Sequence, residues 1–419
     1  PDPFGMLFIP MGSYNMGPSD QDVPYALTAQ SKTVSVQAFY MDQTEISNNE
    51  YRQFVYHVRD SIARRIMGEE VDEDYYLTSV NRYDEELDPP TINWWAKLRW
   101  NEAESREALE PMFLPEGERF MRRREIDARK LNYTYYWIDY KRAARRESRD
   151  ALNAEAGERH AFNTDRSSFI MREEINVYPD TLAWMHDFTY SFNEPMTKNY
   201  FWHPAYDNYP VVGVSWKQAT AFCAWRTQLR TDFLTSNGGV MVNDFRLPTE
   251  SEWEWAARGG LDLSPYPWGG PYIRNSGGCM LGNFKPMRGR YFDDGGFYTV
   301  KSYSYNPNGY GLYCMSGNVA EWTETAFDES VYEFSHDLSP EYRYHAMDWD
   351  PPSMKRKVIR GGSWKDIGYY LQTGTRTYEY QDTSKSYVGF RCVQTHIGRG
   401  GGDFDNEGGE EIDSDIELR

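Results

Sequence analysis

The segment from Arg246 to Gly260, RLPTESEWEWAARGG, constrains the fold more than any other part of the chain. It predicts a short helix with both ends defined. Thr249 can accept a hydrogen bond from the backbone N–H of Glu252, and the Glu252 carboxylate can accept one from the N–H of Thr249. The glycines at 259 and 260 can end the helix.

The same helix predicts the packing around it. Trp253, Ala256 and Ala257 follow the i, i+3, i+4 spacing of a buried face. Glu254 and Arg258 are four residues apart, so we predict an ion pair between them on the solvent side. Because two tryptophans in so short a helix need many neighbours, we expect the rest of the chain to enclose it.

Composition narrows the class of protein. Aromatic residues make up 16% of the 419 residues, while the mean hydropathy is −0.78. This combination favours an irregular, loop-rich core of aromatics that also form hydrogen bonds. The net charge of −19 argues against a nucleic-acid binder, which must neutralise phosphates. No run approaches the roughly 18 apolar residues that a membrane span requires.

The first 60 residues predict two strand-forming runs and a helix. The runs are MLFIPMGSYNMG at 6–17 and TVSVQAFYMD at 33–42, and we expect them to open a sheet. Ser47 begins SNNE, a second capping box. The apolar face of the helix that follows comprises Tyr51, Phe54, Val55 and Val58.

After Asp60 the chain changes for about 145 residues to dense charge interrupted by aromatic clusters. We predict a separate, mostly helical insertion that the core does not need. Because protein interfaces enrich Arg and Trp at their centres, it is a candidate partner-binding surface. The alternative is a solvated charged helix whose aromatics pack on the main domain. The candidate residues are Trp94, Trp95, Arg122, Arg123, Arg124 and Trp137.

The main pattern resumes at Tyr209. PVVGVSW predicts a strand, and Ser215 can cap the helix that follows it. Glycine-rich turns with aromatics continue to residue 392. The last 17 residues hold about eight carboxylates, a composition that cannot drive folding by itself. The predicted organisation is a core at 1–59 and 206–395, an insertion at 60–205 and an acidic tail at 396–419.

Eight motifs, in order, carry a resemblance to a known family. They are MGSYNMG, MDQTEISNNEYRQF, PVVGVSWKQATAFCAW, RLPTESEWEWAARGG, YPWG, GLYCMSGNVAEW, RGGSW and GFRC. Over residues 6–59 and 209–392 the chain resembles the sulfatase-modifying factors, the formylglycine-generating enzymes. The resemblance implies an α+β, irregular fold related to C-type lectins. It also implies calcium sites and, in active members, a copper-binding cysteine pair that oxidises a substrate cysteine.

The cysteine pair is the point where the chain departs from this family. The corresponding positions hold Asp366 and Leu371. Copper(I) selects soft sulfur ligands, which neither side chain offers. We therefore expect no copper and no oxidase activity. Asp366, near Ser363, is the only candidate for an altered chemistry.

The family also has a structural disulfide, at the positions of Cys223 and Cys392. Such a bond would close a loop of about 170 residues and stabilise the fold by ~4 to 5 kcal/mol in the chain-entropy model. It would also place the protein in an oxidising compartment. The alternative is two buried free thiols. Whether Cys279 and Cys314 pair is left open.

Calcium is the cofactor that the resemblance implies. Asn283 and Asp294, with nearby backbone carbonyls, match one family site, and oxygen ligands suit this hard cation. Glu321 matches a second site. There Cys314 takes the place of an oxygen ligand, and a thiol is a poor ligand for calcium.

The chain also resembles the gliding-motility lipoproteins, called GldK in gliding bacteria and PorK in others. The shared features are the lost cysteines, the insertion and the acidic tail. This resemblance implies a lipoprotein on the periplasmic face of the outer membrane of a Bacteroidota-type bacterium, with its lipid anchor before Pro1. It implies a non-catalytic subunit of the type IX secretion ring, which self-associates and binds a GldN/PorN-like partner. The alternatives are the sister lipoprotein GldJ, an oxidase of altered chemistry, and a calcium-dependent binder of glycans or peptidoglycan.

Overall fold

The computed structural model describes residues 3–18, 31–80, 86–146, 148, 166–187, 195–239, 242–286 and 296–396. Within these ranges the fold mixes helices with several small sheets, as predicted. None of the described helices combines the length and apolar character needed to cross a membrane. The predicted acidic tail at 396–419 lies, apart from His396, outside the described residues.

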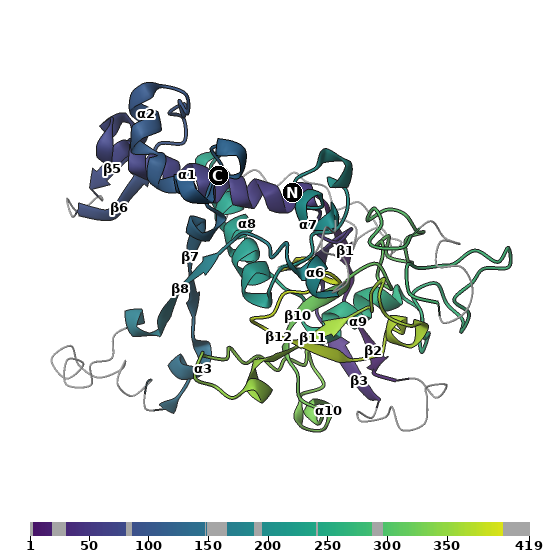
Figure 1. The fold of residues 1–419 in the computed structure, drawn as a ribbon. Coiled ribbons are helices and arrows are strands. Elements are labelled where there is room, and N and C mark those ends of the chain that lie inside the picture. The colour runs from purple at the N-terminus through teal and green to yellow at the C-terminus, as the bar shows by residue number, and fades with distance from the viewer. Residues whose placement is uncertain are drawn as a thin grey trace, which may run out of the picture.

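Two four-stranded sheets form the centre of the described fold (Figure 1). The first, ordered β1-β4-β14-β9, is antiparallel throughout and contains Met6–Ile9, Phe39–Asp42, Val393–Thr395 and Phe245–Arg246. The second is ordered β12-β11-β10-β13 and contains Thr377–Tyr380, Arg356–Arg360, Ala320–Ala326 and Val388–Gly389. Its β10 and β13 are parallel.

Three antiparallel pairs complete the described strands. They are β2 with β3 (Gly12–Met16, Lys32–Val36), β5 with β6 (Tyr76–Val80, Glu86–Ile92) and β7 with β8 (Asn132–Ile138, Ile170–Asn176). Each predicted run in the first 42 residues is therefore two strands, which belong to different sheets. The predicted strand at 209–215 forms only an isolated bridge, between Pro210 and Ser47.

Three helices are longer than two turns: α1 (Asn48–Glu70), α8 (Trp216–Ser236) and α9 (Glu250–Arg258). The short helices are α2 (Ala103–Ala108), α3 (Tyr140–Ala143), α6 (Ala183–Asp187), α7 (Pro195–Asn199) and α10 (Val331–Phe334). The 3-10 turns are Glu73–Tyr75, Glu110–Met112, Glu116–Glu118, Phe120–Arg122, Ala128–Lys130, Arg166–Phe169, Pro204–Tyr206, Pro352–Lys355 and Gly368–Leu371.

The predicted helix caps are confirmed. Ser47, Ser215 and Thr249 each form a complete capping box. Gly259 ends α9 with φ 58°, in the left-handed region that glycine enters without steric cost. Trp253 is fully buried, so the prediction that the chain encloses this helix is also confirmed.

The ion pair on α9 is present but lies in the interior. Arg258 Nη2 is 2.6 Å from Glu254 Oε1, with side-chain exposures of 3% and 0%. The prediction of a solvent-side pair was wrong because helical spacing identifies which residues meet, not what covers them. Here Tyr14 of β2 and Arg360 of β11 cover the pair.

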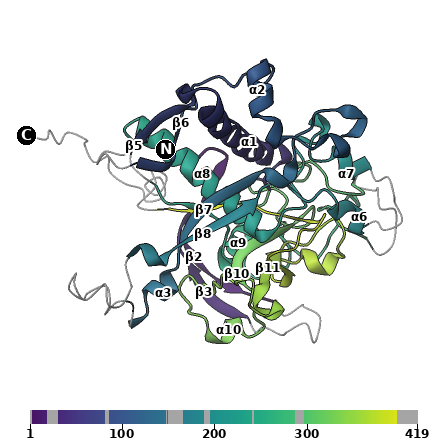
Figure 2. The ribbon, with the colours of Figure 1, turned by 60° about the vertical axis from the view of Figure 1, so that its left-hand side comes forward.

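In its described residues, the insertion is neither mostly helical nor a separate packing unit. The segment YTYYWI, predicted as helix, forms β7, because alternating aromatic and β-branched residues suit a pleated, half-buried surface. Figure 2 shows β7 and β8 crossing in front of α8 and α9. Leu131, Tyr135, Val177 and Phe201 share one buried cluster with residues of α1 and α8. The predicted core at 1–59 and 206–395 is therefore not closed without the insertion.

Candidate functional site

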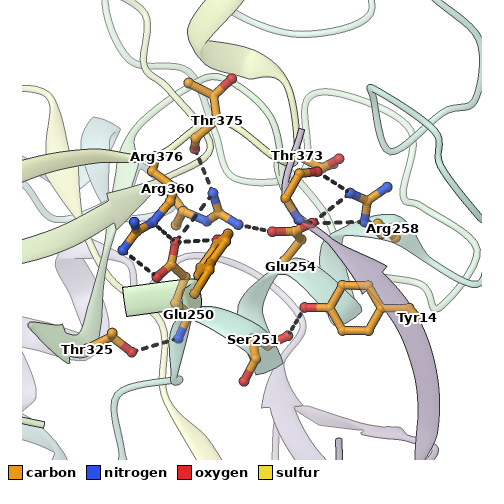
Figure 3. A network of polar contacts seen from close by, with 12 residues as sticks. Tyr14, Glu250, Ser251, Glu254, Arg258, Thr325, Arg360, Thr373, Thr375 and Arg376 are labelled. Atoms are coloured by element: carbon orange, nitrogen blue, oxygen red, sulfur yellow. Dashed lines mark hydrogen bonds and ion pairs between the residues drawn. The ribbon is translucent and has the colours of Figure 1, made fainter. Parts of the chain in front are cut away.

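Charged side chains of α9 form a buried network with Arg360 of β11 and Arg376, which directly precedes β12 (Figure 3). Glu254 accepts from Arg258 and from Arg360, and all three side chains are almost completely buried. Glu250 accepts from Arg376 Nη2 at 3.0 Å. Burial disfavours the charged form of Glu250, yet Arg376 and Arg360 hold its pKa below the usual value.

This network stabilises the fold and offers no reactive group. Each of its carboxylates has an arginine partner, and the Tyr14 hydroxyl donates to the Ser251 carbonyl at 2.8 Å. Sequence analysis did not predict it, because the arginines lie more than 100 residues from α9. The nearest signal was the dense acidic content of TESEWE in an otherwise buried helix.

The loop after β11 holds the two positions where the family resemblance places copper ligands. Asp366 Oδ2 accepts from Ser363 Oγ at 2.6 Å, and burial raises the pKa of Asp366. Leu371 is fully buried and packs against the aromatic side chains of Tyr266 and Phe284. One position is thus part of a hydrogen-bonded turn, and the other belongs to a small apolar core.

The cysteines lie in contrasting surroundings. The sulfurs of Cys223 and Cys392 are 3.3 Å apart and buried, but the two residues are not bonded. The disulfide therefore stays a prediction. The two sulfurs would have to move closer together to form it. Cys314 is buried, with its sulfur 3.4 Å from the Ser302 carbonyl oxygen, whereas Cys279 is exposed. Neither of these two is bonded.

Glu321, predicted as a calcium ligand, is neutralised by an arginine. Its carboxylate accepts from Arg391 Nη2 at 2.5 Å, from Arg391 Nε at 2.7 Å and from Trp253 Nε1 at 2.7 Å. A guanidinium on the same carboxylate repels a cation. Together with the neighbouring Cys314, this donor set does not fit calcium.

Glu45 lies beside Glu321 and was not predicted as part of any site. It is fully buried and accepts from Asn318 Nδ2 at 2.7 Å and from the Val319 N–H at 3.3 Å. Burial, followed by the negative charge of Glu321, raises the pKa of Glu45 to about 8. The local sequence, MDQTEIS, contains no signal that would single out this glutamate.

The structure describes one of the two side chains of the other predicted calcium site, that of Asn283. Asn283 is buried, and its amide nitrogen donates to the Tyr298 carbonyl at 2.7 Å. Its amide oxygen faces Gly296, where a Cβ atom would lie only 2.8 Å away. Asp294 lies outside the described residues. Across the described ranges, no cluster of three or more His, Cys, Asp or Glu side chains could hold a metal.

Four of the six predicted partner-binding residues are exposed: Trp94, at 42%, Trp95, at 91%, Arg122 and Arg123. Met121 and Arg122 both adopt left-handed backbone conformations, with φ 49° and 57°. Non-glycine residues rarely adopt this conformation. The turn at 121–123 therefore keeps its strained backbone at a local conformational cost, and the side chains of Arg122 and Arg123 on it are exposed.

Trp94 and the two remaining predicted residues, Arg124 and Trp137, have structural contacts. Trp94 stacks on His57 with ring centroids 4.3 Å apart. Arg124 lies 3.8 Å above the Phe113 ring and pairs with Glu110. Trp137 packs against His345, also at 4.3 Å.

Comparisons with known proteins agree on one family. Residues 2–396 match the model described as "Sulfatase-modifying factor enzyme 1-like domain". The chain is 35% identical over 192 residues to the "Inactive C-alpha-formylglycine-generating enzyme 2" of Bos taurus, a match covering 44% of this chain and 50% of the relative. It is 34% identical over 194 residues to the "Formylglycine-generating enzyme" of Streptomyces coelicolor, covering 44% of this chain and 52% of the relative.

These matches span about half the length of the curated relatives. Among solved structures, the chain is similar to PvdO from Pseudomonas aeruginosa, with a TM-score of 0.49 and 15% identity. That match covers 93% of this chain and 94% of PvdO.

Proposed function

The chain belongs to the family of sulfatase-modifying factor enzyme 1-like domains, and from that premise we propose that it is a non-catalytic member with a structural role. We assign this role to the periplasmic, outer-membrane-associated ring of a type IX secretion system. There it would self-associate and assemble with a GldN/PorN-like partner. The family itself includes relatives named as inactive and relatives named as active enzymes.

The proposal rests on the residues that occupy the two positions where the family resemblance places the copper-binding cysteines. Asp366 and Leu371 offer no sulfur, and the chain has no cysteine between Cys314 and Cys392 that could replace them. Leu371 fills an apolar core, so this region is packed for stability. Copper(I) chemistry needs soft ligands, which are missing here.

The alternative of an oxidase with altered chemistry depends on Asp366. Its carboxylate is already engaged by the Ser363 hydroxyl. A carboxylate cannot undergo thiol–disulfide exchange, which requires an attacking thiolate. This favours the structural role over a modified enzyme.

Assignment to the secretion ring is the finer part of the proposal. It is supported by the resemblance of the motifs, the insertion and the acidic tail to the gliding-motility lipoproteins. The exposed Trp95, Arg122 and Arg123 add side chains of the kind that protein interfaces enrich. Calcium at Asn283 and Asp294 is retained as a structural proposal, without copper.

The first prediction tests catalysis. Purified protein incubated with copper(I), oxygen and a sulfatase-type CxPxR peptide should yield no formylglycine, because neither copper-ligand position is a cysteine. Mass spectrometry of the peptide measures this. The Streptomyces coelicolor relative, treated in the same way, is the positive control. An aldehyde product from this chain would contradict the non-catalytic assignment.

The structural role has its own test. The protein, co-expressed with its GldN/PorN-like partner, should co-purify with it and form ring-shaped particles in negative-stain images. A protein that stays monomeric with the partner present would overturn the ring assignment and leave the non-catalytic assignment standing.

A further inference from the structure

The ribbon of β7 and β8 leaves the outer edge of β7 without a neighbouring strand in the described part of the chain (Figure 1). Bonds from the Val177 N–H to the Leu131 carbonyl and from the Asp139 N–H to the Phe169 carbonyl continue the ladder at its two ends. Bonded and non-bonded pairs alternate along antiparallel strands. The backbone groups of the even-numbered β7 residues therefore point away from β8.

After Asn132, the first residue of the strand, these even-numbered residues are Thr134, Tyr136 and Ile138. No hydrogen bond links their backbone N–H or C=O groups to another described residue. Three successive outward positions form the hydrogen-bonding template that an added strand would use.

A groove of about 200 Å³ follows this edge. One wall is the segment 135–137 of β7, and no β8 residue contributes. Successive side chains of a strand point to opposite faces of the sheet, so a groove on one face is lined by every second residue. A groove lined by consecutive residues therefore runs along the edge of the strand. The opposite wall is the segment 244–247 around β9. The floor is formed by α8 residues Thr220, Cys223, Ala224 and Thr227.

Two backbone groups of the β9 wall already have side-chain partners. The Phe245 N–H donates to Thr227 Oγ1 at 2.9 Å, and the Leu247 carbonyl accepts from Arg246 Nη1 at 3.2 Å. An incoming strand would therefore pair with β7, with β9 as a side wall.

The outer edge of β8 differs from that of β7. Its outward positions include the charged Arg172 and Glu174, and the Asn176 carbonyl accepts from Gln218 of α8 at 3.0 Å. Charged residues on an edge strand deter pairing with other chains. The β7 sequence NYTYYWI has no charge, no proline and no glycine, which favours strand addition.

The polar groups beside the groove indicate the chemistry of the occupant. Arg246 is paired with Glu252, and Glu324 with Arg343. Asp244 is exposed and has no ion-pair partner among the described residues. The unpaired carboxylate of Asp244 beside the groove favours a cationic side chain.

We propose that the outer edge of β7 accepts one extended segment of a partner protein, which adds as a third strand and places a basic side chain near Asp244. The chain's own acidic tail has the wrong charge for this position. The inference rests on the proposed structural role only for the identity of the partner. Backbone bonds would supply affinity, and the groove walls would supply specificity.

Two defined peptides test the site. The first is fluorescein-labelled Thr-Val-Lys-Val-Lys-Val-Thr, and the second has glutamate in place of both lysines. Fluorescence anisotropy with the full chain should show saturable binding of the lysine peptide, about tenfold tighter than that of the glutamate peptide. The variant Asp244→Asn should reduce this preference.

Matched proline variants test the edge itself. Tyr136→Pro removes an outward N–H without removing a bond to β8, and proline is tolerated at such edge positions. It should weaken binding of the lysine peptide about tenfold. Its register partner across the ribbon provides the control, because Arg172→Pro removes an outward N–H from the opposite edge. Arg172→Pro should bind within about twofold of the unmodified chain.

Tyr136→Val separates the backbone from the ring, since it keeps the N–H. It should bind more tightly than Tyr136→Pro. Equal binding to the Tyr136→Pro and unmodified chains, both folded by circular dichroism, would overturn the proposal, as would no binding of either peptide. If the peptides fail while the chain still assembles with its ring partner, the edge site is wrong and the structural role stands.

Discussion

At the residue scale, the buried carboxylates of this protein differ in how their charge is compensated. Glu254 and Glu321 each have an arginine partner in the interior. Glu45 lies in the same interior with only an amide and a backbone N–H as donors. Burying a carboxylate without a direct cationic partner favours its protonated form.

A pH prediction follows for Glu45. Its pKa is raised from 4.5 to about 8 in the folded protein, so the folded state keeps a proton that the unfolded chain releases. The stability from this proton is fully present below about pH 4.5 and is lost as the pH rises to about 8. From pH 5 to 8, the free energy of unfolding should therefore fall, by about 3 kcal/mol more than in Glu45→Gln.

Urea denaturation at closely spaced pH values measures this difference. The glutamine variant keeps an acceptor for Asn318 and Val319 and removes the titration. Parallel stability curves for the two proteins would mean that Glu45 does not hold its proton in the folded state.

At the element scale, the predictable features were those encoded within a few residues. The capping boxes at Ser47, Ser215 and Thr249 depend on residues three positions apart, and all three formed. The buried face of α9 was also predictable from its spacing. The depth of the Glu254–Arg258 pair was not, because β2 and β11, which cover it, are distant in sequence.

The element that sequence analysis assigned wrongly is β7. The segment YTYYWI lies in the charged, aromatic insertion, which sequence analysis assigned as mostly helical. In the fold, the inward side chains of the strand pack on α8, and tertiary packing overrides weak local propensity. Tyr135 is buried, whereas its neighbour Tyr136 is 64% exposed.

These adjacent tyrosines provide a matched pair. Tyr135→Ala should lower the free energy of unfolding by about 3 to 5 kcal/mol, because it removes a buried ring and its hydrogen bond to Glu173. Tyr136→Ala should change it by no more than about 0.5 kcal/mol. Chemical denaturation measures both. Similar losses for the two variants would contradict the assignment of the inward face of β7.

At the scale of the whole molecule, the insertion contributes to the core and also presents exposed side chains. Leu131 and Phe201 pack with α1 and α8, so excision of 60–205 is expected to unfold the protein. The sequence showed where the family motifs stop and resume but could not show this packing, since each buried contact joins segments far apart in the chain. A test of partner binding therefore needs point substitutions that leave the core intact.

The exposed turn at Arg122 and Arg123 suits such a test. Replacing both with glutamate should reduce co-purification with the GldN/PorN-like partner about tenfold and leave the melting temperature unchanged, because both side chains are exposed. Arg124 is excluded, since it pairs with Glu110 and packs on Phe113, so its reversal would disturb the insertion.

The matched control changes the same net charge elsewhere on the surface. Lys285→Glu combined with Lys301→Glu reverses two exposed lysines of the core region and should leave assembly at the unmodified yield. Partner binding is specific to the insertion if only the arginine variant loses it. If neither variant loses the partner, the interface lies on another surface. Equal losses from both variants would instead indicate a salt-dependent, non-specific attraction, which responds to either reversal.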